Sequence, residues 1–356
     1  MSATDESLQT ILDNILKEYE PDGMRLTDSS LNEEVRLLIK AKLANVLLER
    51  LKLKIEDKLD ASKEIEIEFE AAVYRTWKKP LNLLALLLNV CLEVANELTL
   101  EQGAKPSVKQ SCVQEALARQ QANACLVFNE ILHLLKSGFP SGAHLHWRAL
   151  HEIACASYFI SKHGEKIAKR FLDYEVVENH FQVEAMLKHQ QKMECASLSK
   201  RDFKELNKKF AKMRETYGSD FVRKSNYPYG WIPRQVLKTR SLKEVEKKAV
   251  ELEVLRSYYD LASYNVFGGP RRLIFKSGIM KSDSESMVLP VGPSNYGLAD
   301  PGKSAAISLG QVTACLLMVE PTAKRLIVVE ALRNLVDEVC DAFCEIQADF
   351  GKFSKI

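Results

Sequence analysis

Apolar side chains recur every three or four residues along most of the chain, the spacing that places them on one face of an α-helix. Val35, Leu38, Ile39 and Leu43 show this pattern in one segment, and Gly or Pro residues separate several segments from one another. The predicted helices span residues 8–20, 31–58, 64–77, 79–103, 107–137, 143–162, 165–195, 199–217, 241–267, 304–319 and 321–350.

Two parts of the chain also show features that are typical of β-strands. In residues 64–70 apolar and polar residues alternate, but Ile65, Phe69 and Val73 form a helical face as well, and the surroundings favour a helix. Residues 272–276 and 286–290 are short apolar runs after the Gly-Gly-Pro of residues 268–270. They predict one small β-hairpin near residues 270–292 in a mainly α, multi-helix bundle.

Composition and charge support this fold class. The 356 residues include only 15 Gly and 11 Pro, which argues against an all-β fold with many turns. The formal net charge of +2 hides an acidic N-terminal end and a basic flank, residues 188–248, which hold seventeen Lys and Arg against seven Asp and Glu. We therefore expect an acidic helical extension, residues 1–104, followed by a helical bundle domain, residues 105–356.

The chain begins with an acidic, polar segment, so we predict a cytoplasmic protein without a signal peptide. Residues 81–100 form the most apolar window, but five Asn and Glu residues interrupt it, which predicts a buried helix and no membrane partner. Apolar helices of this kind favour a homodimer. The eight Cys are scattered among apolar neighbours, which predicts reduced, packed thiols, no metal site and no cofactor.

Residues 297–304 match the phosphate-loop pattern G-x-x-x-x-G-K-[ST], in which backbone amides cradle phosphates, the Lys neutralises charge and the Ser holds Mg²⁺. Gly302, Lys303 and Ser304 take the last three positions. The context argues against nucleotide binding, because no buried strand leads directly into the segment and the 52 residues after Ser304 are predicted as two helices. We favour coincidence and keep nucleotide binding at 297–304 as a third hypothesis.

Four polar or thiol side chains lie along one stripe of the predicted helix 143–162: His144, Arg148, His151 and Cys155. Glu152 lies one turn beyond Arg148. One hypothesis is a structural Arg148–Glu152 ion pair inside the bundle, with His151 hydrogen-bonded nearby. The other is a catalytic site in which His151 is the general base and Arg148 stabilises a phosphorane-like oxyanion. The sequence favours the structural hypothesis, because buried charges persist only when they are paired.

The basic flank contains a candidate nucleic-acid-binding surface. Cationic side chains recur through residues 204–224 and precede a loop whose Tyr227, Tyr229 and Trp231 offer rings for base stacking. The predicted contact residues are Lys204, Lys208, Lys209, Lys212, Arg214, Arg223, Lys224 and Trp231. Glu205 and Glu215 lie among the lysines, so a solvated helix face with core-filling aromatic rings is the competing interpretation.

The order of several short motifs between residues 120 and 320 resembles domain-of-unknown-function family 5677, a microbial family of helical proteins. The motifs are the turn 138–142, His-Trp-Arg-Ala-Leu-His-Glu at 146–152, Tyr-Gly-Trp at 229–231, Tyr-Tyr-Asp-Leu-Ala-Ser-Tyr at 258–264 and Gly-Gly-Pro at 268–270. The resemblance implies an α-bundle with an Arg and a Glu on an inner helix, here Arg148 and Glu152. It also implies a His near Phe267, which this chain lacks.

Such families are placed beside the HEPN-type helical ribonucleases of microbial defence and toxin systems, which use an Arg followed after four to six residues by a His. Here the step from Arg148 to His151 is too short, and the step from Arg170 to His180 is too long. The resemblance therefore implies the fold and a defence-like setting more than a nuclease.

From these observations we expect a prokaryotic intracellular interaction protein, in a defence or toxin-like system, that binds RNA, DNA or a protein partner through its basic flank. The alternative is a metal-independent, HEPN-like ribonuclease centred on Arg148, His151 and Glu152, with the cations of 204–224 guiding the substrate. Whether these three side chains line an open cleft or lie sealed in the interior separates the two hypotheses.

Overall fold

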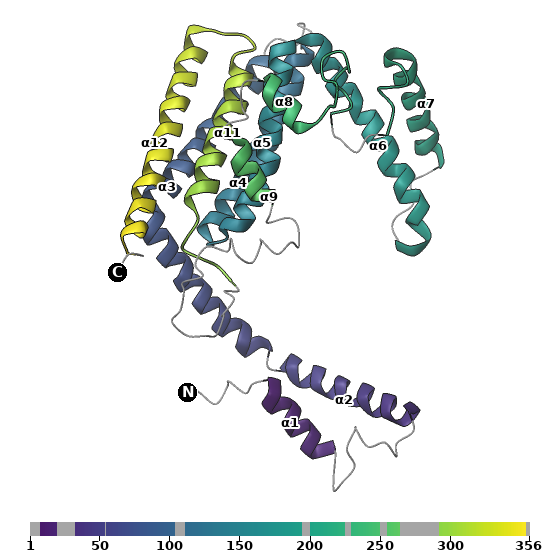
Figure 1. Cartoon of the computed structure of the whole chain (residues 1–356), viewed down its shortest axis with the longest axis vertical. Helices are drawn as coiled ribbons and strands as arrows, with labels where there is room; N and C mark the ends of the chain where they lie inside the picture. The colour runs from purple at the N-terminus through teal and green to yellow at the C-terminus, as the bar shows by residue number, and fades with distance from the viewer. Residues whose placement is uncertain are drawn as a thin grey trace. The chain divides into compact units, whose positions relative to one another are not determined.

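The structure is a computed structural model of the chain (Figure 1), and it describes residues 8–19, 33–53, 55–103, 111–193, 200–224, 229–249, 255–263 and 292–353. Every regular element in these ranges is an α-helix, so the mainly α prediction is confirmed. Contacts divide the chain into two compact units, Met1–Ala72 and Val73–Ile356. Residues 73–103, which we assigned to the N-terminal extension, fall in the second unit.

The first unit contains α1 (Leu8–Tyr19), α2 (Glu33–Leu53) and the beginning of α3 (Ile55–Gly103). Ile11, Ile15 and Leu43 are its buried core, because the apolar faces of α1 and α2 meet there. Residues 64–70, whose alternation also suggested a strand, lie within α3, and the prediction of a helix is confirmed.

Helix α3 continues through Pro80, where the sequence predicted that a new helix begins. Proline has no N–H for the carbonyl four residues earlier, and its ring crowds that carbonyl. The chain adapts at Trp77, whose φ of −105° and ψ of 20° are not helical. The indole is fully buried, and its Nε1 donates to Oδ1 of Asn295 at 2.8 Å. The kink at Trp77 divides α3 into two helical segments, where the sequence predicted that one helix ends and the next begins.

The second unit is built on α4 (Cys112–Lys136), α5 (Pro140–His163), α11 (Ala299–Leu317) and α12 (Ala323–Phe353), which pack together as Figure 1 shows. Buried hydrogen bonds tie these helices to one another. Nε1 of Trp147 on α5 donates to Oγ of Ser308 on α11 at 3.0 Å. Nε2 of Gln121 on α4 donates to the Cys91 carbonyl of α3 and to Oγ1 of Thr313 on α11, both at 3.1 Å. Since buried donors need partners, these contacts fix how the helices face each other.

Four further helices, α6 to α9, complete the described part of this unit. Gly164, with φ of +70°, separates α5 from α6 (Glu165–Met193), as the sequence predicted, and α7 (Lys200–Tyr217) packs back against α6. Helices α8 (Leu242–Ala249) and α9 (Arg256–Ser263) both pack on α5. They lie within the segment 241–267, which the sequence predicted as one helix.

The predicted β-hairpin near residues 270–292 falls almost entirely in 264–291, outside the described residues, and no strand occurs in the part of the chain that the structure describes. One described helix, between Ser62 and Glu101, is long and apolar enough to cross a membrane by length and composition alone. Core helices pass the same test, and Trp77, Leu84 and Cys91 of this segment are buried in the bundle.

Candidate functional site

The phosphate-loop pattern does not form a phosphate loop. Helix α11 begins at Ala299, so Gly302, Lys303 and Ser304 lie within a helix whose own hydrogen bonds occupy their backbone. A Cβ at Gly302 would lie 2.3 Å from Cζ of Phe343, which shows that this glycine permits close packing against α12. Nζ of Lys303 lies 3.5 Å from Oδ1 of Asp300, and Ser304 is buried. The geometry therefore supports the interpretation that the match of residues 297–304 to the phosphate-loop pattern is a coincidence.

Arg148 and Glu152 do not form the direct ion pair that the sequence suggested; the hydroxyl of Tyr259 links them instead. Nη2 of Arg148 donates to this hydroxyl at 2.9 Å, and the hydroxyl donates to Oε1 of Glu152 at 2.5 Å. The guanidinium also lies over the Tyr259 ring, 4.6 Å from its centroid. Burial and the Glu152 carboxylate raise the pKa of Tyr259 to about 12, so the phenol keeps the proton that it donates.

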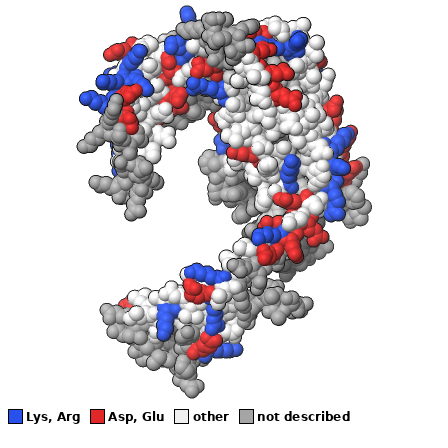
Figure 2. Space-filling view, turned by 180° about the vertical axis from the view of Figure 1, so that it is seen from behind, with Lys and Arg blue, Asp and Glu red and all other residues white. Residues whose placement is uncertain are grey.

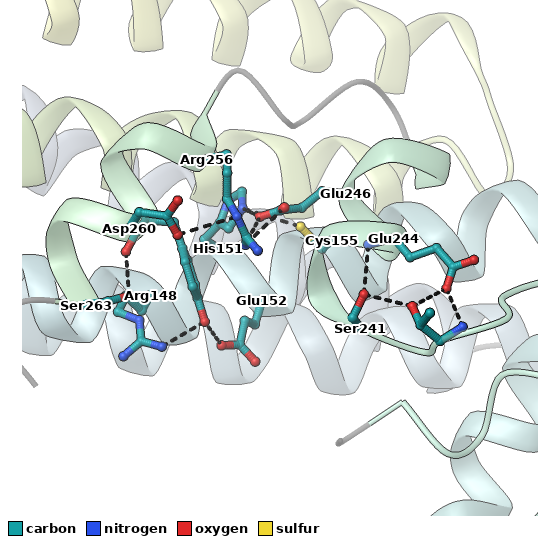
Figure 3. A network of polar contacts seen from close by, with 12 residues as sticks. Arg148, His151, Glu152, Cys155, Ser241, Glu244, Glu246, Arg256, Asp260 and Ser263 are labelled. Atoms are coloured by element: carbon teal, nitrogen blue, oxygen red, sulfur yellow. Dashed lines mark hydrogen bonds and ion pairs between the residues drawn. The ribbon is translucent and has the colours of Figure 1, made fainter. Parts of the chain in front are cut away.

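His151 lies in a sealed cluster on the other side of this network (Figure 3). Its Nε2 is 2.9 Å from Oε1 of Glu246 on α8, and both side chains are fully buried. Sγ of Cys155 is 3.6 Å from the same His151 nitrogen. Nη1 of Arg256 on α9 lies 3.1 Å from Oε2 of Glu246, and Nε of Arg256 lies 3.5 Å from Oδ1 of Asp260.

These contacts weigh against the ribonuclease hypothesis. A general base must reach the proton that it abstracts, and the imidazole of His151 has no exposed surface. Arg148 and Glu152 are half-buried, but each is already bound to Tyr259. The site residues Arg148, His151 and Glu152 thus lie on one helix but have different hydrogen-bond partners, and the Tyr259 ring, whose centroid is 5.7 Å from that of His151, lies between the two groups.

A cavity of about 520 Å³ adjoins Glu152, between α4, α5, α6 and the turn at 229–231. Glu175 and Glu178 of α6 also line it, and their charges add to that of Glu152. Burial and the neighbouring Glu175 raise the pKa of Glu178. Arg119 lines the cavity too and pairs with Glu175 at 3.2 Å, which leaves Glu152 and Glu178 without a cation in the lining. This acidic excess disfavours phosphate groups, so the cavity suits a nucleic-acid substrate poorly.

The cations that the sequence proposed for nucleic-acid binding are exposed in the structure. Lys204, Lys208 and Lys212 follow one another at four-residue intervals along α7, and no ion pair of theirs is found among the described residues. Nζ of Lys209 lies 3.3 Å from Oε1 of Glu205. Figure 2 shows blue side chains along the arm that carries α7, mixed with red ones. The remaining exposed cations of the proposed set are Arg214, Arg223 and Lys224.

Trp231 does not offer a ring for base stacking, and its place in the proposed interface was wrong. The side chain is 3% exposed, and its ring packs edge-on against Phe159 and Phe171, with centroids 5.7 and 5.2 Å away. Tyr229 is buried as well, whereas Tyr227 lies outside the described residues. A Pro- and Gly-containing loop thus supplies core aromatics here, because its rings fill the space between α5 and α6.

A second cavity, of about 540 Å³, lies beside the exposed cations, between α6, α7 and the turn at 218–223. Arg214 and Arg223 line it together with the rings of Phe181, His180 and Phe210. Glu184 and Asp220 line it as well, but Glu184 is paired with Lys188, and Asp220 is paired with Arg234 and Arg240. The rings of His180 and Phe210 are stacked, with centroids 3.9 Å apart. Phe181 was not singled out in the sequence, because an isolated Phe on a helix looks like a core residue.

Comparison with known proteins gives a family for part of the chain. Residues 114–284 match DUF5677, described as a family of unknown function. None of the curated proteins and none of the solved structures compared with the chain matches it. The matched segment includes α5 to α9, and therefore the Arg148–Tyr259–Glu152 network, the buried His151 cluster, and α7 with residues 218–224.

Proposed function

We propose that the chain binds single-stranded nucleic acid through α7 and the turn that follows it. This function is argued from the geometry, because DUF5677, which residues 114–284 match, is a family of unknown function. The basic arm, defined as α7 and residues 218–224, supplies the binding surface. The observation that carries the proposal is a row of exposed lysines beside a cavity lined by arginines and aromatic rings. The defence or toxin-like setting implied by the resemblance stays a prediction.

The electrostatics of the arm suit a polyanion. Helix α7 holds seven Lys and Arg against three Asp and Glu.

 Because Lys204, Lys208 and Lys212 share one stripe of the helix and are exposed, they can contact successive phosphates without first breaking an ion pair. Phosphate contacts of this kind position a strand and carry no sequence information.

The cavity beside the lysines suits an unpaired base. Arg214 and Arg223 line it and offer donors to phosphate, while Phe181 and the stacked His180 and Phe210 rings offer flat apolar faces. Nζ of Lys224 lies 5.8 Å from the centroid of the Phe181 ring, so a cation and a ring adjoin here. Bases in a duplex are already stacked, and this combination therefore favours a single strand.

Fluorescence anisotropy with labelled oligouridylate, oligothymidylate and a duplex of equal length tests the proposal on the full chain. We expect binding of the single strands, with a log–log salt slope of about −0.7 for each phosphate that is neutralised. Lys208→Glu with Lys212→Glu should weaken binding at least about tenfold and flatten the slope by about 1.4. The matched control is Lys243→Glu with Lys247→Glu, an exposed pair on α8.

Three outcomes contradict the proposal: no binding at about 50 mM salt, equal losses in both pairs, or a preference for the duplex. Phe181→Leu tests the cavity separately and should weaken single-strand binding while the salt slope stays unchanged. Incubation of the same oligonucleotides in EDTA tests the ribonuclease alternative. Cleavage that is lost in Arg148→Ala would replace binding alone with catalysis as the function.

A further inference from the structure

Three different metal-ligand types meet in the sealed cluster on α5 and α8. Nε2 of His151, Sγ of Cys155 and a carboxylate oxygen of Glu246 all lie within 4.8 Å of one another, and all three residues are buried. His151 and Cys155 lie one helical turn apart, so α5 presents them side by side. Glu246 reaches them from α8, which packs on α5.

Two polar atoms near this cluster are buried without a hydrogen-bond partner among the described residues: Nδ1 of His151 and the hydroxyl of Tyr229. Oε2 of Glu246 is ion-paired with Nη1 of Arg256 at 3.1 Å, and Nδ1 lies on the other side of the His151 ring from Nε2. Burial raises the pKa of Tyr229, and the nearby Glu152 and Cys155 side chains add to this shift, so the hydroxyl lies in the same neighbourhood. Buried polar atoms are nearly always satisfied in proteins, and an unpaired group calls for an explanation such as an ion or a water.

We propose that His151, Cys155 and Glu246 bind one divalent metal ion of the zinc class. Imidazole, thiolate and carboxylate are the ligands that zinc takes, with bonds of about 2.0–2.3 Å. Two such bonds at a tetrahedral angle place N and S about 3.6 Å apart. The observed separation of Nε2 and Sγ is 3.6 Å. Oε1 of Glu246, now 2.9 Å from Nε2, would retreat by a few tenths of an ångström.

Charge balance in the cluster is compatible with a metal ion. On binding, Cys155 would release its thiol proton and Glu246 would keep its negative charge, which together offset the two positive charges of the ion. Arg256 contacts the Glu246 carboxylate and is itself paired with Asp260, so that second pair is neutral. An ion bound in this way ties α8 to α5, and the proposal does not depend on nucleic-acid binding.

Titration of the metal-stripped full chain with Co²⁺ tests the site, because cobalt reports its ligands by absorption. We expect one ion per chain, with the visible bands of a tetrahedral ion and a near-ultraviolet thiolate charge-transfer band. Cys155→Ser should abolish the charge-transfer band, whereas Cys315→Ser, another buried thiol, should retain it. Glu246→Gln should weaken Co²⁺ binding at least about tenfold with the thiolate band still present at saturation.

The proposal is overturned if no thiolate band develops, if the band survives in Cys155→Ser, or if Cys315→Ser removes it. Circular dichroism of each variant without metal shows whether it keeps its helices. If Cys155→Ser fails to fold, the unsubstituted chain is loaded with Co²⁺ and then titrated with Zn²⁺. A thiolate band that disappears as Zn²⁺ replaces Co²⁺ supports the site. A chain that shows no thiolate band before Zn²⁺ is added contradicts it.

Discussion

Nε2 of His151 lies 2.9 Å from Oε1 of Glu246, and neither side chain has exposed surface. The two residues are 95 positions apart in the chain, and α8 contacts α5 where they meet. A buried carboxylate needs partners, and this one has His151 and Arg256. The pair therefore makes the position of α8 on α5 specific.

Removal of the carboxylate should destabilise the protein strongly. Glu246→Ala leaves His151 and Arg256 without their shared partner, and we expect a loss of about 3 kcal/mol in the free energy of unfolding. Urea denaturation of the metal-stripped chain measures this. Lys247→Ala, on the exposed side of the same helix, should change stability by less than about 0.5 kcal/mol. Similar losses in both variants would show that the His151–Glu246 pair makes no specific contribution to the free energy of unfolding.

The Tyr259 hydroxyl should contribute to stability through its two contacts. Tyr259→Phe keeps the ring but removes the group that joins Arg148 to Glu152, and we expect a loss of about 1–2 kcal/mol. The neighbouring Tyr258 is 38% exposed, so Tyr258→Phe is the control and should be nearly neutral. Denaturant unfolding of the two variants gives the comparison. A neutral Tyr259→Phe would mean that water replaces the hydroxyl.

Gly302 should be intolerant of a side chain for a packing reason. Gly302→Ala places a Cβ 2.3 Å from Cζ of Phe343 and should cost about 1–3 kcal/mol of stability. Phe343→Leu in the same chain should recover part of this loss. Gly142→Ala is the control, because its new Cβ would lie 3.4 Å from Cδ2 of Leu134. Thermal unfolding measures the stability of both variants.

The same measurement with and without ATP tests the nucleotide hypothesis at residues 297–304. A rise in melting temperature with ATP that Lys303→Ala abolishes would restore that hypothesis.

Stability should fall in mild acid because of His144. Burial lowers the pKa of this imidazole below 6.5, so the unfolded chain takes up its proton at a higher pH than the folded chain does. The stability that the neutral, buried His144 imidazole contributes is therefore complete above about pH 6.5. It is lost as the pH falls further, by at most about 1.4 kcal/mol per pH unit for one proton.

Urea denaturation across this pH range checks the expectation, and His144→Gln should reduce the slope. Burial and the nearby Lys162 also lower the pKa of His163, so His163→Gln should flatten the remaining dependence. An unchanged slope in the His144→Gln variant would contradict the assignment.

Local patterns were sufficient for much of the fold and failed where packing decides. Periodicity predicted the α-helical class and the helix at 64–70, and Gly164 marked the end of α5. The sequence also predicted the break in α3 near Trp77, but it did not show that Trp77 is anchored to Asn295, 218 positions away. Nor did it show that α11 begins before Gly302, where contact with Phe343 makes a glycine suitable inside a helix.

For the candidate sites, the sequence by itself determined which side chains share a helix: His151 and Cys155 on α5, and the lysines on α7. Helical geometry fixes such neighbours within a few residues. Only the tertiary structure decided three further points. Glu246 completes the buried cluster, the Tyr259 hydroxyl links Arg148 to Glu152, and Trp231 is buried. The physical reason is that burial and partner choice depend on which helices pack together, and those contacts join residues too far apart for any local spacing to reveal.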